Sequence, residues 1–103
     1  MTRVGFYVVQ AAESGQRLHV AARLADKAYA RGHRVYINAA DKPQDPGKHT
    51  DLLINLQLDI PAFFSRFARV AEVVTQDATS LQALRSSWRF YQERGYQLEK
   101  HDL

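Results

Sequence analysis

Hydrophobic and polar positions along the chain predict strands and helices in turn. Residues 4–10, VGFYVVQ, are rich in β-branched and aromatic side chains and too short for a helix, so they predict a buried strand. A helix follows, with Ser14 as a candidate N-cap, and runs to about Arg31, where Gly32 ends it. The narrow apolar face predicted for this helix consists of Leu18, Ala21, Ala25, Ala28 and Tyr29.

The alternation continues to the end of the chain. Residues 34–38 predict a second strand, and a strand, a helix and a strand imply a parallel pair. Further strands are expected at 51–56 and 70–75, with a short helix over 61–67 that Asp59 caps. A last helix over about 80–94 is capped by Asp77 or Thr79, ends at Gly95 and precedes an extended segment over 96–100. The pattern predicts one Rossmann-like α/β layered domain over residues 1–103, with a mainly parallel sheet flanked by helices.

One connection does not fit this pattern. The second and third expected strands are joined by AADKPQDPGKHT, which has two prolines, one glycine and no apolar period. A parallel crossover usually takes a dozen or more residues and contains a helix that covers the sheet. Either these two strands are not parallel neighbours, or a segment is missing between residues 40 and 47.

The last helix combines aromatic and basic residues in two stripes. Leu84, Trp88 and Tyr91 follow the i, i+4, i+7 spacing of a buried face. Arg85 and Arg89 repeat that spacing one residue later and cannot neutralise one another. The spacing alone favours a core helix with a solvated flank. The alternative is a seat for an acidic peptide with a hydrophobic end, in which Val74 completes an apolar slot.

Composition and charge narrow the function classes. The chain has no cysteine, which excludes a disulfide framework, a thiol nucleophile and a thiolate metal site. Its formal net charge of +3 suits acidic partners but falls short of the dense cationic clustering of a dedicated duplex-DNA binder. No apolar run is long enough to span a membrane, and a signal-peptide pattern is lacking, so a cytoplasmic location is expected.

Motifs for cofactor chemistry or catalysis are lacking. The loop after the first strand has a single glycine, Gly15, and no glycine-rich phosphate loop occurs. The four histidines show no metal-binding spacing, and no G-x-S-x-G nucleophile motif is present. We therefore expect a binding protein without cofactor or metal, rather than an enzyme.

Five segments together resemble the chi subunit of bacterial DNA polymerase III: FYVV, RGHRVYI, DLLINL, FFSRFARVAEVV and RSSWRFYQERGYQL. The similarity runs through nearly all of the chain in the same order. It implies a non-catalytic replisome subunit that binds the acidic C-terminal tail of single-stranded-DNA-binding protein. It also implies pairing with the psi subunit, which links chi to the clamp loader.

The resemblance places the tail-binding positions on Arg85, Trp88 and Arg89, and less specifically on Val74. Ser87 stands where the family often has a further basic residue, which weakens the expected anion site.

A segment of about thirty to forty residues that the family carries is absent between Gln44 and Asp45, where the crossover is too short. In the family this segment contributes to the psi interface, so its absence puts psi binding in doubt. It is either a genuine deletion or a stretch lost from the sequence as given. The second is favoured, because losing the crossover would uncover one face of the sheet.

A direct single-stranded nucleic-acid-binding module, in which Trp88 or Tyr91 stacks on bases, is the alternative function. The modest net charge and the few lysines near the last helix favour the adaptor.

Overall fold

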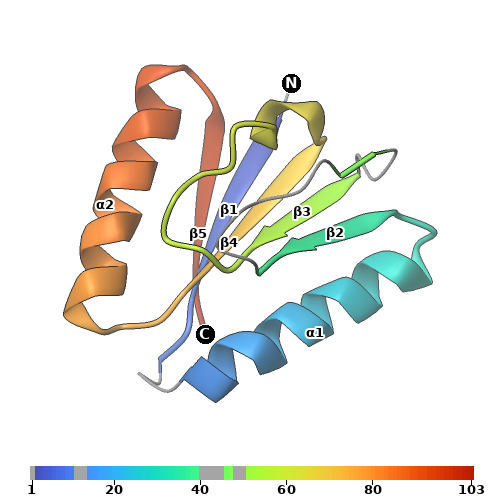
Figure 1. Ribbon diagram of the computed structural model, residues 1–103, viewed down its shortest axis with the longest axis horizontal. Coiled ribbons are helices and arrows are strands. Elements are labelled where there is room, and N and C mark those ends of the chain that lie inside the picture. The colour runs from blue at the N-terminus through green and yellow to red at the C-terminus, as the bar shows by residue number, and fades with distance from the viewer. Residues whose placement is uncertain (1, 11–13, 40–45, 48–50) are drawn as a thin grey trace.

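The computed structural model describes residues 2–10, 14–39, 46–47 and 51–103. Five strands, all parallel, form one sheet in the order β2-β3-β4-β1-β5 (Figure 1). The strands are β1 (Arg3–Val8), β2 (Val35–Asn38), β3 (Leu52–Asn55), β4 (Arg69–Val74) and β5 (Gln97–Asp102). Helices α1 (Ser14–Ala30) and α2 (Ala78–Glu93) pack on opposite faces of this sheet. The predicted α/β layered fold with a parallel sheet is confirmed. Within the described residues, no helix is both long and apolar enough to cross a membrane.

The order of the strands corrects two expectations. β1 and β2 are parallel but not neighbours, because β4 and β3 lie between them. β2 and β3, in contrast, are parallel neighbours in register from Val35 with Leu52 to Asn38 with Asn55. The first explanation for the short connection, that these strands do not pair in parallel, is therefore wrong.

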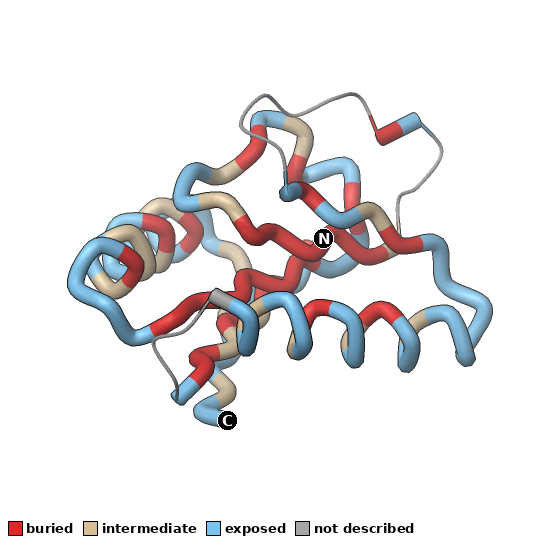
Figure 2. The backbone as a smooth tube through the Cα atoms, turned by 60° about the horizontal axis from the view of Figure 1, so that its bottom comes forward, coloured by how far each residue is buried: buried red, intermediate tan, exposed pale blue. Residues whose placement is uncertain are grey.

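The core on the α1 face is built from small and branched side chains. Ala21 and Ala25 are buried against it, with Val20, Leu24 and Ala28 packed beside them. Figure 2 shows these buried positions recurring along one side of α1. Leu18 and Tyr29, predicted on this face, are instead 57% and 61% exposed. They lie on the outer side of α1, because its contact stripe runs through positions 21, 24, 25 and 28.

The core on the α2 face is largely aromatic. Phe6, Phe67 and Tyr91 are fully buried in it, and Phe64 is 7% exposed. The helix predicted over 61–67 is reduced to a single 3-10 turn, η1 (Phe64–Arg66), with no side-chain cap, so the predicted cap by Asp59 is wrong. The predicted helix of seven residues could form few intrahelical hydrogen bonds to offset the cost of nucleation.

A row of buried polar side chains crosses the α2 face. The Nδ2 of Asn38 donates to the Oδ1 of Asn55 at 2.9 Å, and the Nδ2 of Asn55 donates to Oε1 of Glu72 at 2.9 Å. The hydroxyl of Tyr91 donates to the other Glu72 oxygen at 2.8 Å. These three strand residues are neighbours in register, so hydrogen bonds run from β2 through β3 and β4 to α2. Since these side chains are buried away from solvent, breaking their hydrogen bonds would be costly, and the bonds hold α2 at a defined place on the sheet.

Asp77, one of the two predicted caps, begins α2. Its carboxylate accepts from the backbone N–H of Ser80 at 3.1 Å and from the Thr75 hydroxyl at 2.5 Å. The Thr75 hydroxyl, followed by the Ser80 bonds, lowers the pKa of Asp77 from 3.8 to about 2. The charged cap therefore stabilises the fold above about pH 4, and this contribution is lost as the pH falls towards 2.

We expect Asp77→Ala to lower the thermal midpoint at pH 7, because it leaves the Ser80 N–H without its acceptor. The same substitution should have a clearly smaller effect near pH 2, where about half of the wild-type carboxyls are protonated. Thermal unfolding followed by circular dichroism at the two pH values measures this difference. Thr79→Ala, at an exposed position inside the helix, is the control and should change the midpoint little. Equal shifts in the two variants at pH 7 would contradict the cap.

Candidate functional site

Helix α2 has an inner face and two different flanks. Tyr91 is fully buried on the inner face, with Leu84 and Trp88 half-buried beside it. One flank faces residues 58–64, and Ser87 and Phe90 lie there. Arg85 and Arg89 project from the side opposite Ser87, because each lies two residues, or about 200°, away on the helix. This second flank, with Trp88 at its base, is the candidate site.

Trp88 joins the core to the surface. Its ring centroid lies 5.2 Å from that of Phe6 at an interplanar angle of 45°. The side chain is neither fully buried nor fully exposed. The indole thus packs on β1 and still presents part of its apolar surface to solvent.

Arg85 and Arg89 are both exposed. Within the part of the chain that the structure describes, neither side chain has an ion pair or a hydrogen-bond partner. They are one helical turn apart, so both guanidinium groups are directed to the same flank. Each offers a planar fork of donors that matches a carboxylate.

Lys100 is a further cation at this site that the sequence did not indicate. It pairs in register with Phe6, so its side chain lies on the α2 face next to the ring on which Trp88 packs. Its ammonium is 3.7 Å from a carboxylate oxygen of Asp102, and both side chains are more than half exposed. An exposed pair of this kind is weak, so Lys100 remains available to an external anion.

Val74 and Ser87 lie away from the two arginines. Val74 is 9% exposed at the end of β4 and, with Phe6 and Leu84, lines a small hollow of about 20 Å³ beneath α2. Ser87 is 7% exposed and lies on the opposite flank. A basic side chain at this position would not stand beside Arg85, so the pair of arginines is unaffected by the serine. Tyr91 is 0% exposed and cannot stack on a base, which excludes that version of the alternative function.

Glu72 is the one strongly perturbed acid beneath α2 among the described residues. Burial raises its pKa from 4.5 to about 7, and the hydrogen bonds from Tyr91 and Asn55 offset only part of that rise. Burial and the nearby Glu72 carboxylate in turn raise the pKa of Tyr91. Glu72 can therefore hold a proton near neutral pH. The signal in the sequence was a lone acid in the apolar run VAEVV, which we did not single out.

The other flank of α2 forms an open groove of about 750 Å³ with residues 58–64. Its lining is mostly apolar on the loop side, from Leu58, Ile60, Pro61 and Phe64, and mostly polar on the helix side. Among the described residues, no group of three or more His, Cys, Asp or Glu side chains is arranged to hold a metal ion.

Comparison with known proteins bears on what these residues do. The family model described as DNA polymerase III chi subunit, HolC, matches residues 1–45 and 40–99. The curated protein DNA polymerase III subunit chi of Pseudomonas aeruginosa is 38% identical over 139 residues, covering 100% of this chain and 98% of the relative. The aligned region exceeds the 103 residues of this chain by 36 positions. The chain therefore belongs to the DNA polymerase III chi subunit family.

Proposed function

We propose that this protein is a non-catalytic adaptor subunit of DNA polymerase III that works in the bacterial cytoplasm during replication. It binds the acidic C-terminal tail of single-stranded-DNA-binding protein and connects it to the clamp loader through the psi subunit. The observation that carries the proposal is the half-buried Trp88 beside Arg85 and Arg89, two exposed cations one turn apart.

The flank suits an acidic peptide with an aromatic end. Arg85 and Arg89 are available for two carboxylates, and Lys100 adds a third cation at the far side of Trp88. Trp88, which packs on the buried Phe6, provides the apolar floor on which a terminal ring packs. Val74 supports this floor from below, since it lies beneath α2 rather than at its surface. Because the cations are exposed, affinity should be moderate and should fall as salt rises.

The proposal is tested by titrating the protein with an acidic tail peptide that ends in phenylalanine. Arg89→Ala is expected to weaken binding by about 1–3 kcal/mol, the usual contribution of a charged hydrogen bond. Isothermal titration calorimetry at several salt concentrations measures both the loss and the salt dependence.

Arg94→Ala is the matched control. It removes the same charge from the same end of α2, but Arg94 lies over the Phe90 ring at 3.7 Å, on the other flank. It should bind the peptide as the wild type does. The proposal fails if the wild type does not bind, or if Arg89→Ala binds as tightly as the wild type.

The short connection between β2 and β3 bears on one part of this function, the link through psi. We propose that the positions lacking in this chain fall between β2 and β3, where the two matched stretches of the family meet at residues 40–45. Because a stretch lost from the sequence as given is the favoured explanation, we expect the purified natural protein to have an intact mass several kilodaltons above the 11.8 kDa of these 103 residues and to associate with psi. Mass spectrometry and size-exclusion chromatography with psi measure these. A mass of 11.8 kDa would show instead that the deletion is genuine, and little association with psi would then be expected.

A further inference from the structure

A second surface lies on the opposite face of the sheet from Trp88. Helix α1 packs mainly over β2, β3 and β4, so it leaves this side of β1 and β5 uncovered. Two hollows of about 280 and 130 Å³ follow the edge of α1 there and share Tyr7, Leu24 and Lys27. A third, around Gly5, joins them at Arg69. We call this continuous depression the α1 trough.

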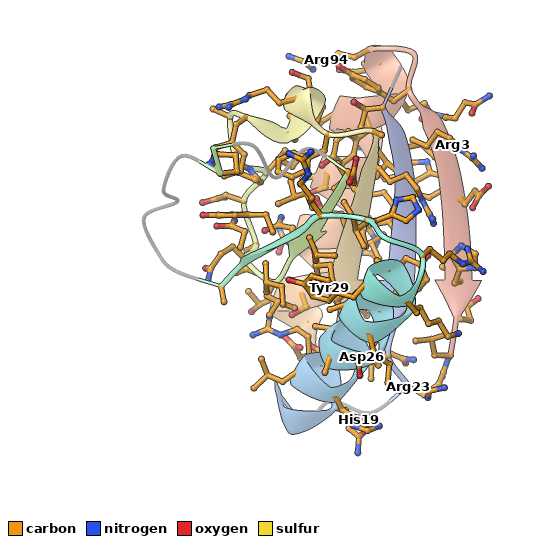
Figure 3. All side chains as sticks on the ribbon, turned by 90° about the vertical axis from the view of Figure 1, so that its right-hand side faces the viewer. Arg3, His19, Arg23, Asp26, Tyr29 and Arg94 are labelled. Atoms are coloured by element: carbon orange, nitrogen blue, oxygen red, sulfur yellow. The ribbon has the colours of Figure 1, made fainter. Side chains whose placement is uncertain are left out.

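One wall of the trough is a row of cations. Arg23, Lys27 and Arg31 follow one another at four-residue intervals, which places them about 6 Å apart along the helix axis. All three are exposed, and in the described part of the chain none has an ion pair or a hydrogen-bonded side-chain partner. Figure 3 shows Arg23 on the side of α1 that faces β5, whereas Asp26 lies on the outward side.

The floor of the trough is aromatic. Tyr7 is half-buried and stacks on His101 of β5, with ring centroids 4.6 Å apart and an interplanar angle of 12°. The Tyr7 ring lies over Gly5, since a Cβ atom there would meet its Cε1 at 3.1 Å. Because Gly5 has no side chain, the Tyr7 ring can lie on the sheet surface at this position.

The charges in the trough are unbalanced. Five cationic side chains line it, namely Arg3, Arg23, Lys27, Arg31 and Arg69, against the two side-chain carboxylates of Asp51 and Glu99. Glu99 is 3.5 Å from Arg3 and 3.4 Å from the Nε2 of His101, and Asp51 accepts from the backbone N–H of Arg34 at 2.7 Å. The excess of three positive charges equals the net charge of the whole chain. The ligand that suits this surface is an anion.

We propose that the α1 trough binds single-stranded nucleic acid. Cations at regular intervals match the repeating phosphates of one strand, and the Tyr7 ring offers a stacking platform for a base. An acidic peptide would use the cations but not the platform. Because the trough and the Trp88 flank lie on opposite faces, one molecule can hold a strand and the tail of single-stranded-DNA-binding protein together.

Fluorescence anisotropy with a labelled oligothymidine of about 20 nucleotides tests this in low salt. The full chain should bind with a Kd on the order of 10⁻⁵ M. Arg23→Gln with Lys27→Gln keeps helix propensity and should weaken binding roughly tenfold. It should also reduce the slope of log K against log salt by about 1.4, the share of two phosphate contacts on a single strand. Arg85→Gln with Arg89→Gln removes the same charge from the other face and should leave binding unchanged.

Tyr7→Leu separates stacking from charge. It should weaken binding about fivefold or more and leave the salt slope unchanged, because no ionic contact is lost. Unaltered circular dichroism shows that each variant is folded, and unaltered tail-peptide binding is a second check for the variants at Arg23, Lys27 and Tyr7. The proposal is overturned if the wild type does not bind the oligonucleotide. It is also overturned if both double variants lose affinity equally, or if duplex DNA or a polyglutamate peptide binds as tightly. None of these results touches the tail-binding proposal, which is measured with the peptide.

Discussion

Phe64→Ala is expected to lower the free energy of unfolding by about 3–5 kcal/mol, the usual cost of truncating a buried phenylalanine. Phe64 is 7% exposed and lies edge-to-face with three rings. The distances between ring centroids are 5.6 Å to Phe90, 5.3 Å to Tyr91 and 5.4 Å to Tyr96. These rings belong to the last turns of α2 and the residues after it. The loss is a large share of the roughly 5–15 kcal/mol that stabilises a small domain. Urea unfolding followed by tryptophan fluorescence measures it as a lower midpoint.

Phe63→Ala is the matched control for this prediction. Phe63 precedes Phe64 and is half-buried. Its ring centroid lies 5.6 Å from that of Tyr36 and 6.2 Å from that of Phe67, near the β2 edge. Water can enter the space that it leaves, so its truncation should cost clearly less. Equal losses, or a loss below about 1 kcal/mol for Phe64→Ala, would show that this ring cluster does not anchor α2.

The sequence predicted the strands well but not their order. Runs such as DLLINL and VAEVV are apolar on both faces, as strands covered on both sides must be, so β3 and β4 were found within one residue at each end. Nothing in a local pattern says which strands pair. The chain passes from β1 to β2 across two positions that β3 and β4 fill later, and only the assembled sheet reveals this.

The candidate site was predicted in part. Helical spacing placed Tyr91 inward and Arg85 and Arg89 outward, because α2 is regular over this stretch. Lys100 was missed because β5, QLEKHD, has no apolar alternation, and its direction follows from pairing with β1. Tyr7 and His101 are 94 residues apart in the chain, and parallel pairing brings them together.

Glu72→Gln is expected to remove most of the pH dependence of stability between about pH 5 and pH 8. Burial raises the folded-state pKa of Glu72 from 4.5 to about 7, so the folded protein binds more protons than the unfolded chain in this range. This stabilising contribution is fully present below about pH 4.5 and is lost as the pH rises through 7. At about 1.4 kcal/mol per pKa unit, it amounts to about 3 kcal/mol.

Urea unfolding at several pH values tests this, with the difference between wild type and variant as the readout. All other ionisable groups are the same in the two proteins, so their effect cancels in the difference. The neutral amide should be about as stable as the wild type near pH 5 and more stable by about 2–3 kcal/mol at pH 8. A difference that stays flat with pH would contradict the raised pKa of Glu72.

Tyr91→Phe tests the same row of hydrogen bonds from α2. Its hydroxyl donates to Glu72 at 2.8 Å and lowers the pKa of that carboxyl. Without it, the pKa of Glu72 should rise further, and the loss of stability with pH should move to higher pH. At pH 8 the ionised carboxylate would be buried without that partner, which costs about 1–3 kcal/mol. Because this bond attaches α2 to the sheet, it also fixes the position of the helix that carries Arg85 and Arg89. Tail binding by Tyr91→Phe should therefore weaken more at pH 8 than at pH 6.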